Sequence, residues 1–159
     1  MDKFIFEQWV PNMVTANQRI QRFAYYDIPI SLKGHLMQTV VVIFSDPKSG
    51  GEEALGRALN ALFLTIELKE KQQDVTLVFQ GAGARWPAEF AKSEHPGHAL
   101  YAAVNDKAIA CGGCADVFGA TTGAELAGVK LIRDKSIPGT TGVLDLSRYL
   151  DQGARLITF

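Results

Sequence analysis

Apolar residues along this chain fall into short β-branched runs that alternate with segments of helical spacing. The run at residues 38–44 predicts a strand buried on both faces. Apolar positions at residues 55–66 then recur with the helical period, and Ser49 with Glu52 has the capping-box spacing that predicts the helix start. Residues 75–79 predict a second buried strand. A strand, a helix and a strand in this order predict two parallel strands joined by a right-handed crossover.

The second half of the chain repeats shorter units of the same kind. Residues 107–110 predict a strand that leads into Cys111, and residues 115–118 predict the first turns of a helix. Thr122 and Glu125 repeat the capping-box spacing before another short helix. The other predicted elements are a helix, a strand, a short helix and a last strand, at residues 98–105, 129–132, 144–150 and 155–159. This alternation predicts an α/β fold, a three-layer α/β/α sandwich with a mostly parallel sheet.

The first 36 residues lack such periodicity. We therefore predict two parts, an N-terminal extension or arm at residues 1–36 and a single domain at residues 37–159. An arm would pack on a neighbouring subunit, with Trp9 and the pair Tyr25-Tyr26 as its anchors. The alternative is a poorly ordered addition ahead of the core.

Composition narrows the class of protein. A hydrophobic fraction of 47% with 21% charged residues is typical of a globular protein. Lys and Arg total 16 against 17 Asp and Glu, and no dense basic run occurs, so we expect no nucleic-acid partner. The longest apolar run, residues 40–44, is far shorter than a membrane span. The first nine residues contain charged side chains among the apolar ones, so they do not form the continuous apolar segment of a secretion signal. We therefore expect no membrane insertion and a cytoplasmic location.

The candidate chemistry is concentrated at Cys111, Gly112, Gly113 and Cys114, which hold the two cysteines of the chain. Cys111 follows a predicted strand, and ligand sites in open α/β sheets lie at the carboxyl ends of strands. The two glycines can adopt backbone angles closed to other residues, so their N–H groups could face the sulfur or a bound anion and favour the thiolate. The competing interpretation is a structural Cys111, with Cys114 either resolving a disulfide or persulfide or packing inward.

Two other groups of side chains are weaker candidates. Lys48 and Arg85 lie in loops after predicted strands, where they could rim the Cys111 pocket and attract an anionic substrate, or be solvated surface charges. His95 and His98 could join the cysteines as four zinc ligands, but Pro96-Gly97 between them indicates a turn, so we expect no metal. Neither a dinucleotide-binding fingerprint nor a phosphate loop is complete, and no organic cofactor is expected.

Residues 40–52, 110–119 and 153–159 resemble the DsrE/DsrF-like family, and the resemblance extends over residues 37–159. It implies a flavodoxin-like sandwich without a flavin, assembled as a homo-oligomer (a dimer, trimer or hexamer). In the sulfur-relay members, a cysteine at the end of a central strand carries sulfane sulfur as a persulfide, with a glycine eight residues later. Cys111 and Gly119 have this spacing, whereas Val117-Phe118 stand where those members carry an Arg before the glycine.

Three classes of function remain open from the sequence. A persulfide carrier, or sulfurtransferase, would need Cys111 alone and would exchange sulfur with a protein donor and a protein acceptor. A thiol–disulfide switch would need both Cys111 and Cys114. A non-catalytic, oligomeric ligand-binding module would tolerate the loss of either thiol, because a fold alone does not determine a function.

Overall fold

The computed structural model describes residues 37–159, so the predicted arm with Trp9 and Tyr25-Tyr26 lies outside the described residues. All strand pairings are parallel, and the strands are ordered β4-β3-β2-β1-β5. They are β1 (Thr39–Ile43), β2 (Val75–Phe79), β3 (Ala108–Cys111), β4 (Lys130–Ile132) and β5 (Arg155–Thr158). The prediction of a mostly parallel sheet is therefore confirmed.

The β-branched run in β1 explains why this strand lies inside the sheet. Its neighbours are β2 and β5, and residues Val40 to Ile43 are all 0% exposed. A parallel strand that is covered on both faces needs apolar side chains at successive positions, not only at alternate ones. The edge strands follow the opposite rule, because β4 and β5 each contain exposed residues and are shorter than β1.

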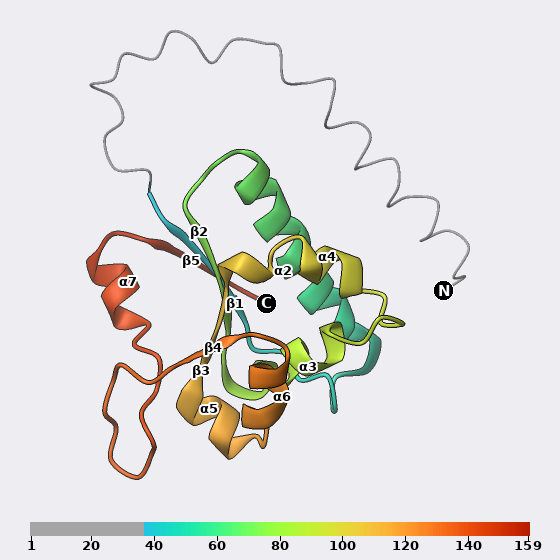
Figure 1. Ribbon diagram of the computed structural model, residues 1–159. Helices are drawn as coiled ribbons and strands as arrows, with labels where there is room; N and C mark the ends of the chain where they lie inside the picture. Colours follow the sequence, from blue (N-terminus) through green and yellow to red (C-terminus); the bar gives the residue numbers. More distant parts are fainter. Residues whose placement is uncertain (1–36) are drawn as a thin grey trace, which may run out of the picture. The chain divides into compact units, whose positions relative to one another are not determined.

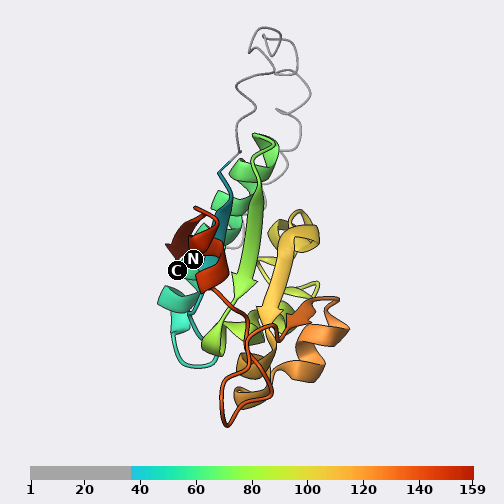
Figure 2. The same ribbon diagram turned by 90° about the vertical axis from the view of Figure 1, so that its left-hand side faces the viewer.

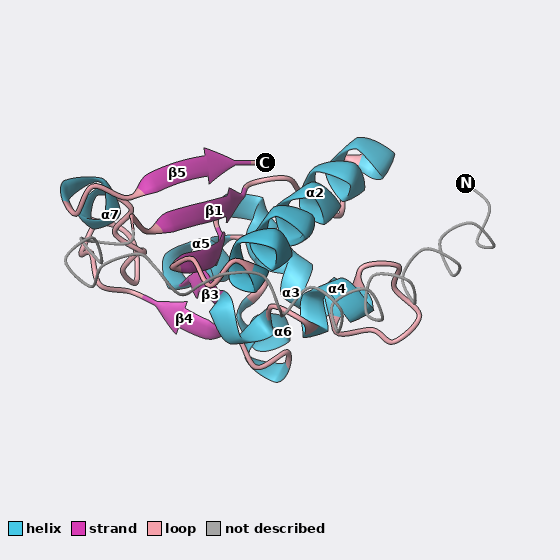
Figure 3. Ribbon diagram, turned by 90° about the horizontal axis from the view of Figure 1, so that it is seen from above, coloured by secondary structure: helices cyan, strands magenta, loops and turns pink. Residues whose placement is uncertain are grey.

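Helices lie on both sides of the sheet, which confirms the three-layer sandwich. Figure 1 shows α2 on one side of the strands and α7 on the other, and Figure 3 shows the same separation from above. The helices are α2 (Gly51–Glu70), α3 (Trp86–Phe90), α4 (His98–Ala102), α5 (Gly112–Val117), α6 (Thr121–Leu126) and α7 (Ser147–Asp151), with short 3-10 turns η2 (Gly81–Arg85) and η3 (Asn105–Lys107).

The order of the strands determines what covers each face. The chain steps from β1 through β2 and β3 to β4 in one direction, and then returns across the sheet to place β5 beside β1. The return connection includes α7 and covers one face, where Tyr149 and Leu144 pack in one cluster with Val40, Val78 and Cys111. Because side chains alternate along a strand, Cys111 shares this face with Ile109.

Both predicted capping boxes are wrong. Helix α2 has Gly50 as its N-cap with no side-chain cap, and the Ser49 hydroxyl donates instead to Asp46 Oδ2 at 3.1 Å. Helix α6 likewise lacks a side-chain cap. At the start of α2 the Asp46 carboxylate accepts the hydrogen bond of the Ser49 hydroxyl, because an ionised acceptor forms the stronger hydrogen bond.

Within the part of the chain that the structure describes, no helix has the length and apolar character to cross a membrane.

Candidate functional site

Cys111 is the point where strand β3 becomes helix α5. It is the last residue of the strand, one position later than predicted, and also the N-cap of the helix, with its Sγ accepting the Cys114 N–H at 3.3 Å. The side chain is 0% exposed and lies beside Ile132 of β4 in the register of the sheet. Cys114 is partly exposed, and both thiols are free. Cys111 therefore lies at the carboxyl end of a strand, as expected, but it is buried.

The surroundings of Cys111 favour its thiolate. The Cys114 thiol and the backbone N–H groups of Leu144, Cys114 and Gly113 lower the pKa of Cys111 to about 6, although burial acts in the opposite direction. The pKa of Cys114 is raised, because its thiol donates to Cys111 and is itself desolvated. The pair thus keeps its shared proton on Cys114 and its negative charge on Cys111.

Gly112 and Gly113 are required for space and not for unusual backbone angles. Neither is among the glycines with positive φ, so the prediction of unusual backbone angles is wrong, whereas the Gly113 N–H does face the Cys111 sulfur as expected. A Cβ on Gly112 would lie 2.4 Å from Cγ of Arg133, and a Cβ on Gly113 would lie 2.6 Å from the carbonyl oxygen of Gly142. The two glycines therefore let another segment of the chain lie directly against the cysteine turn.

That segment is the loop at residues 133–146, which we call the strap. Figures 1 and 2 show it as the orange-to-red loop that projects next to α5. Lys135 and Val143 pair their backbones in both directions at 2.9 Å, which closes the loop at its base. Gly142 and Leu144 are buried, whereas residues 133–141 are exposed. The base of the strap thus covers Cys111.

Asp116 of α5 joins the cysteine helix to the strap. Its carboxylate accepts two bonds from Arg133 Nη2, at 2.9 and 3.0 Å, and one each from the hydroxyls of Thr141 and Thr121. The bonds from Thr121, Thr141 and Arg133 lower the pKa of Asp116 to about 2. Asp116, Arg133 and Leu144 carry no signal in the sequence, because they meet only through contacts between segments distant in the chain.

Arg85 and Lys48 occupy different positions relative to the cysteine turn. The Arg85 guanidinium donates to Asp46 Oδ2 at 2.8 Å and to the Phe118 carbonyl oxygen at 3.0 Å, and it lies over the Phe118 ring. Arg85 is thus next to the end of the cysteine helix, but its charge is already paired. Lys48 is exposed, and its backbone N–H donates to Asp46.

The two histidines are part of a turn. His95 Nδ1 accepts the Gly97 N–H at 3.0 Å, and its ring packs edge-on against Phe90. His98 Nδ1 lies 2.8 Å from the Phe90 carbonyl oxygen, and therefore carries a proton there. Across residues 37–159 no group of three or more His, Cys, Asp or Glu side chains could hold a metal ion.

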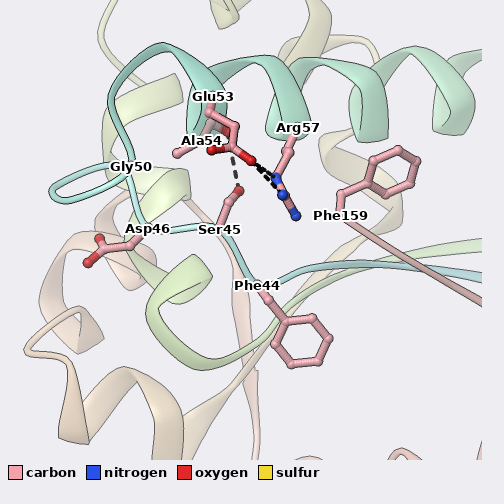
Figure 4. A pocket seen from close by; sticks show the side chains of 8 residues that line it. All are labelled: Phe44, Ser45, Asp46, Gly50, Glu53, Ala54, Arg57 and Phe159. Carbon is pink, nitrogen blue, oxygen red and sulfur yellow. Dashed lines mark hydrogen bonds and ion pairs between the residues drawn. The ribbon is translucent and has the colours of Figure 1, made fainter.

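A pocket of about 360 Å³ lies at the carboxyl ends of β1 and β5, where the direction of strand order changes. Ligands of open α/β sheets bind at such switch points. Figure 4 shows Glu53 and Arg57 side by side on α2, joined by an ion pair of 2.6 Å, with the Phe44 and Phe159 rings as other parts of the lining. Its lining is Phe44, Ser45, Asp46, Gly50, Glu53, Ala54, Arg57 and Phe159. The lining holds no thiol, so Cys111 remains the nucleophilic candidate.

Comparison with known proteins agrees with this fold. Residues 38–159 match the DsrE/DsrF-like family. Uncharacterized protein MJ0733 of Methanocaldococcus jannaschii is 30% identical over 100 residues, which are 62% of this chain and 77% of that protein. A solved structure, a conserved protein of unknown function from Bacteroides thetaiotaomicron (BT1422), has a TM-score of 0.50 at 13% identity, covering 76% of this chain and 94% of its own. That similarity concerns the fold.

Proposed function

Because this chain belongs to the DsrE/DsrF-like family, we propose that it transfers sulfane sulfur, carrying it as a persulfide on Cys111. The observation that supports this function is the cradle of backbone N–H groups around the Cys111 sulfur, which with the Cys114 thiol lowers its pKa to about 6. A lowered pKa favours the thiolate at neutral pH, and the thiolate is the form that attacks sulfur.

The transfer consists of two thiol exchanges. In the first, the Cys111 thiolate attacks the outer sulfur of a donor persulfide, forming a new S–S bond while the S–S bond of the donor breaks and the donor leaves as a thiolate. In the second, an acceptor thiolate attacks that outer sulfur and releases Cys111 as a thiolate. The N–H groups of Gly113 and Cys114 would stabilise this leaving anion, as an oxyanion hole does. Neither exchange needs a metal or an external oxidant.

Cys114 has a supporting part in this scheme. Its raised pKa keeps it protonated, so it donates a hydrogen bond to Cys111 and does not compete as a nucleophile. Cys111 is also the more buried of the two thiols. A thiol–disulfide switch would also need Cys114 to react as a thiolate, and its raised pKa disfavours that form, which favours the persulfide carrier over the switch.

The test is the intact mass of the protein after incubation with inorganic polysulfide and removal of excess reagent. We expect a gain of about 32 Da, one sulfur atom, that a reductant reverses. Cys111→Ser should abolish the gain and Cys114→Ser should retain it, since a serine hydroxyl can still donate to Cys111.

Other outcomes would contradict the proposal in distinct ways. If polysulfide instead removed two hydrogen masses, and only when both cysteines were present, the chain would be a thiol–disulfide switch. If no variant gained mass and both thiols resisted alkylation even after prolonged exposure, the cysteines would be structural.

A further inference from the structure

A nucleophile at the position of Cys111 is not accessible in the closed structure. Its side chain is 0% exposed, and it packs with Leu144 and Tyr149 in an apolar cluster. Thiol exchange requires the attacking sulfur to lie in line with the S–S bond of the donor, so the donor must touch the sulfur directly. Some part of the cover therefore has to move before Cys111 can react.

The strap is the part of the cover that can move at least cost. Tyr149 belongs to helix α7, which adjoins β5, whereas the strap contains no helix and is exposed from residue 133 to residue 141. Segments with little buried apolar surface open locally far more often than the core unfolds, and the side chains that the strap contributes to the apolar cluster are confined to residues 143–146. The strap contacts the cysteine turn chiefly through its base, where the Gly142 carbonyl approaches Gly113 and Leu144 closes over Cys111.

Asp116 is placed to hold this segment down. It lies on α5, the helix that begins directly after Cys111, and it binds the strap at its first residue, Arg133, and in its returning limb at Thr141. Thr121 of α6 donates to the same carboxylate and fixes its position from the opposite side. One carboxylate thus connects the reactive turn to the outgoing and the returning limb of the strap.

We propose that the strap is a gate over Cys111 and that Asp116 is the positioning residue that holds the gate closed. This inference rests on the proposed function in that Cys111 is taken as the reacting atom. When the strap is closed, the Leu144 N–H faces the Cys111 sulfur. When it opens, the sulfur becomes accessible and that N–H is withdrawn, so the same movement admits the donor and makes the thiolate a stronger nucleophile.

The experiment measures the alkylation rate of Cys111 by iodoacetamide, in a Cys114→Ser background where it is the one thiol left in the chain. Removing the negative charge by Asp116→Asn weakens the Arg133 and Thr141 bonds, and we expect alkylation at about pH 8 to become about tenfold faster. Thr141→Val should accelerate it less, since the Arg133 bonds remain. Asp116→Glu should restore most of the closed behaviour.

A matched control is Asp106→Asn. Asp106 also accepts a hydrogen bond from a basic side chain, Lys69, at 2.6 Å, but it lies in η3 and does not contact the strap. The alkylation rate of Cys111 in the Asp106→Asn variant should equal that of the parent. The pH profile of alkylation gives a second readout, because loss of the Leu144 N–H should move its midpoint upward in Asp116→Asn and leave it in place in Asp106→Asn.

Equal alkylation rates and equal midpoints in the parent, Asp116→Asn and Thr141→Val would overturn the gate. So would an equal acceleration by Asp106→Asn, because the effect would then be general loosening of the fold. Thr141→Val keeps the test decisive if Asp116→Asn does not fold. Alkylation involves no sulfur donor, so the gate can fail while polysulfide still loads Cys111, and polysulfide loading can fail while the gate is upheld.

Discussion

Cys111 combines burial with a negative charge, two properties that oppose each other in most proteins. Desolvation raises the pKa of a buried thiol, because the charged form loses water. At Cys111 this effect is outweighed by the Cys114 thiol and by backbone N–H groups of Leu144, Cys114 and Gly113. The charge is thus maintained by dipoles, and the causes that lower the pKa include no cationic side chain.

The first prediction concerns Cys114 as a hydrogen-bond donor. Cys114→Ala removes the largest contribution to the lowered pKa of Cys111, so the pKa should rise from about 6 toward the ordinary value of 9.0. Cys114→Ser should produce a smaller rise, because the hydroxyl can still donate. Ultraviolet absorbance of the thiolate, followed over pH, measures this directly. An unchanged midpoint in Cys114→Ala would mean that the N–H groups suffice.

The second prediction concerns the space at Gly113. Gly113→Ala places a methyl group 2.6 Å from the Gly142 carbonyl oxygen, and we expect a loss of about 1–3 kcal/mol in the free energy of unfolding. Gly56→Ala is the control, because it lies within α2 with nothing within 4 Å of the added Cβ. It should stabilise the protein by about 0.5–1 kcal/mol. Urea unfolding of the two variants should therefore shift in opposite directions.

At the scale of elements, the loop after β1 is organised by one carboxylate. Asp46 accepts the Lys48 N–H, the Ser49 hydroxyl and the Arg85 guanidinium, and so connects the start of α2 to η2. Burial alone would raise the pKa of Asp46, but these bonds outweigh it and lower the pKa. The Asp46–Arg85 pair is mostly shielded from water, with side chains 18% and 21% exposed.

The third prediction follows from this arrangement. Asp46→Asn should lower the free energy of unfolding by about 1–3 kcal/mol at neutral pH, because a half-buried Arg85 loses its charged partner. A carboxyl with a lowered pKa stabilises the fold above its ordinary pKa of 3.8, and this contribution disappears as the pH falls through the lowered value. The difference between Asp46→Asn and the parent should therefore shrink in acid. Asp151→Asn, an exposed change at the end of α7, should show no such difference.

The elements that could be predicted from the sequence are those with strong local patterns. Strand β1 and helix α2 could be located within a few residues. A strand buried on both faces has a continuous apolar run, and a helix buried on one face has apolar residues at helical spacing, so both can be recognised in the sequence. The predicted capping box of α2 was wrong because the Ser49 hydroxyl donates instead to Asp46, whose position depends on the folded loop. Predicting this cap needs the tertiary structure.

The candidate site also has one part that could be predicted from the sequence and one that could not. Cys111 could be predicted, since a cysteine followed by two glycines after a short strand marks the strand end. Its burial could not, because residues 133–146 read as an ordinary loop and nothing local indicates that Gly142 returns to Gly113. Asp116 carries no signal for the same reason, since its partner Arg133 lies 17 positions away.

At the scale of the whole molecule, the feature of interest is the edge of the sheet formed by β5. Among residues 37–159, β5 pairs with β1 on one side and with no strand on the other, and Ile157 is 36% exposed. Leu126, on α6, is 85% exposed. Open strand edges and large exposed apolar side chains are typical of surfaces that another subunit covers. The homo-oligomer stays a prediction, and these two surfaces are where we expect its contacts.

The fourth prediction separates folding from assembly. The five described strands, the cluster around Cys111 and the strap lie within residues 37–159, so a chain beginning at Met37 should unfold in one cooperative transition. If residues 1–36 form an arm that packs on a neighbour, this shortened chain should also form a smaller assembly and melt at a lower temperature than the full chain. Trp9→Ala in the full chain should act in the same direction and more weakly. Sedimentation equilibrium and thermal melting decide the question, because an unchanged assembly and melting temperature would leave the arm without a role in oligomerisation.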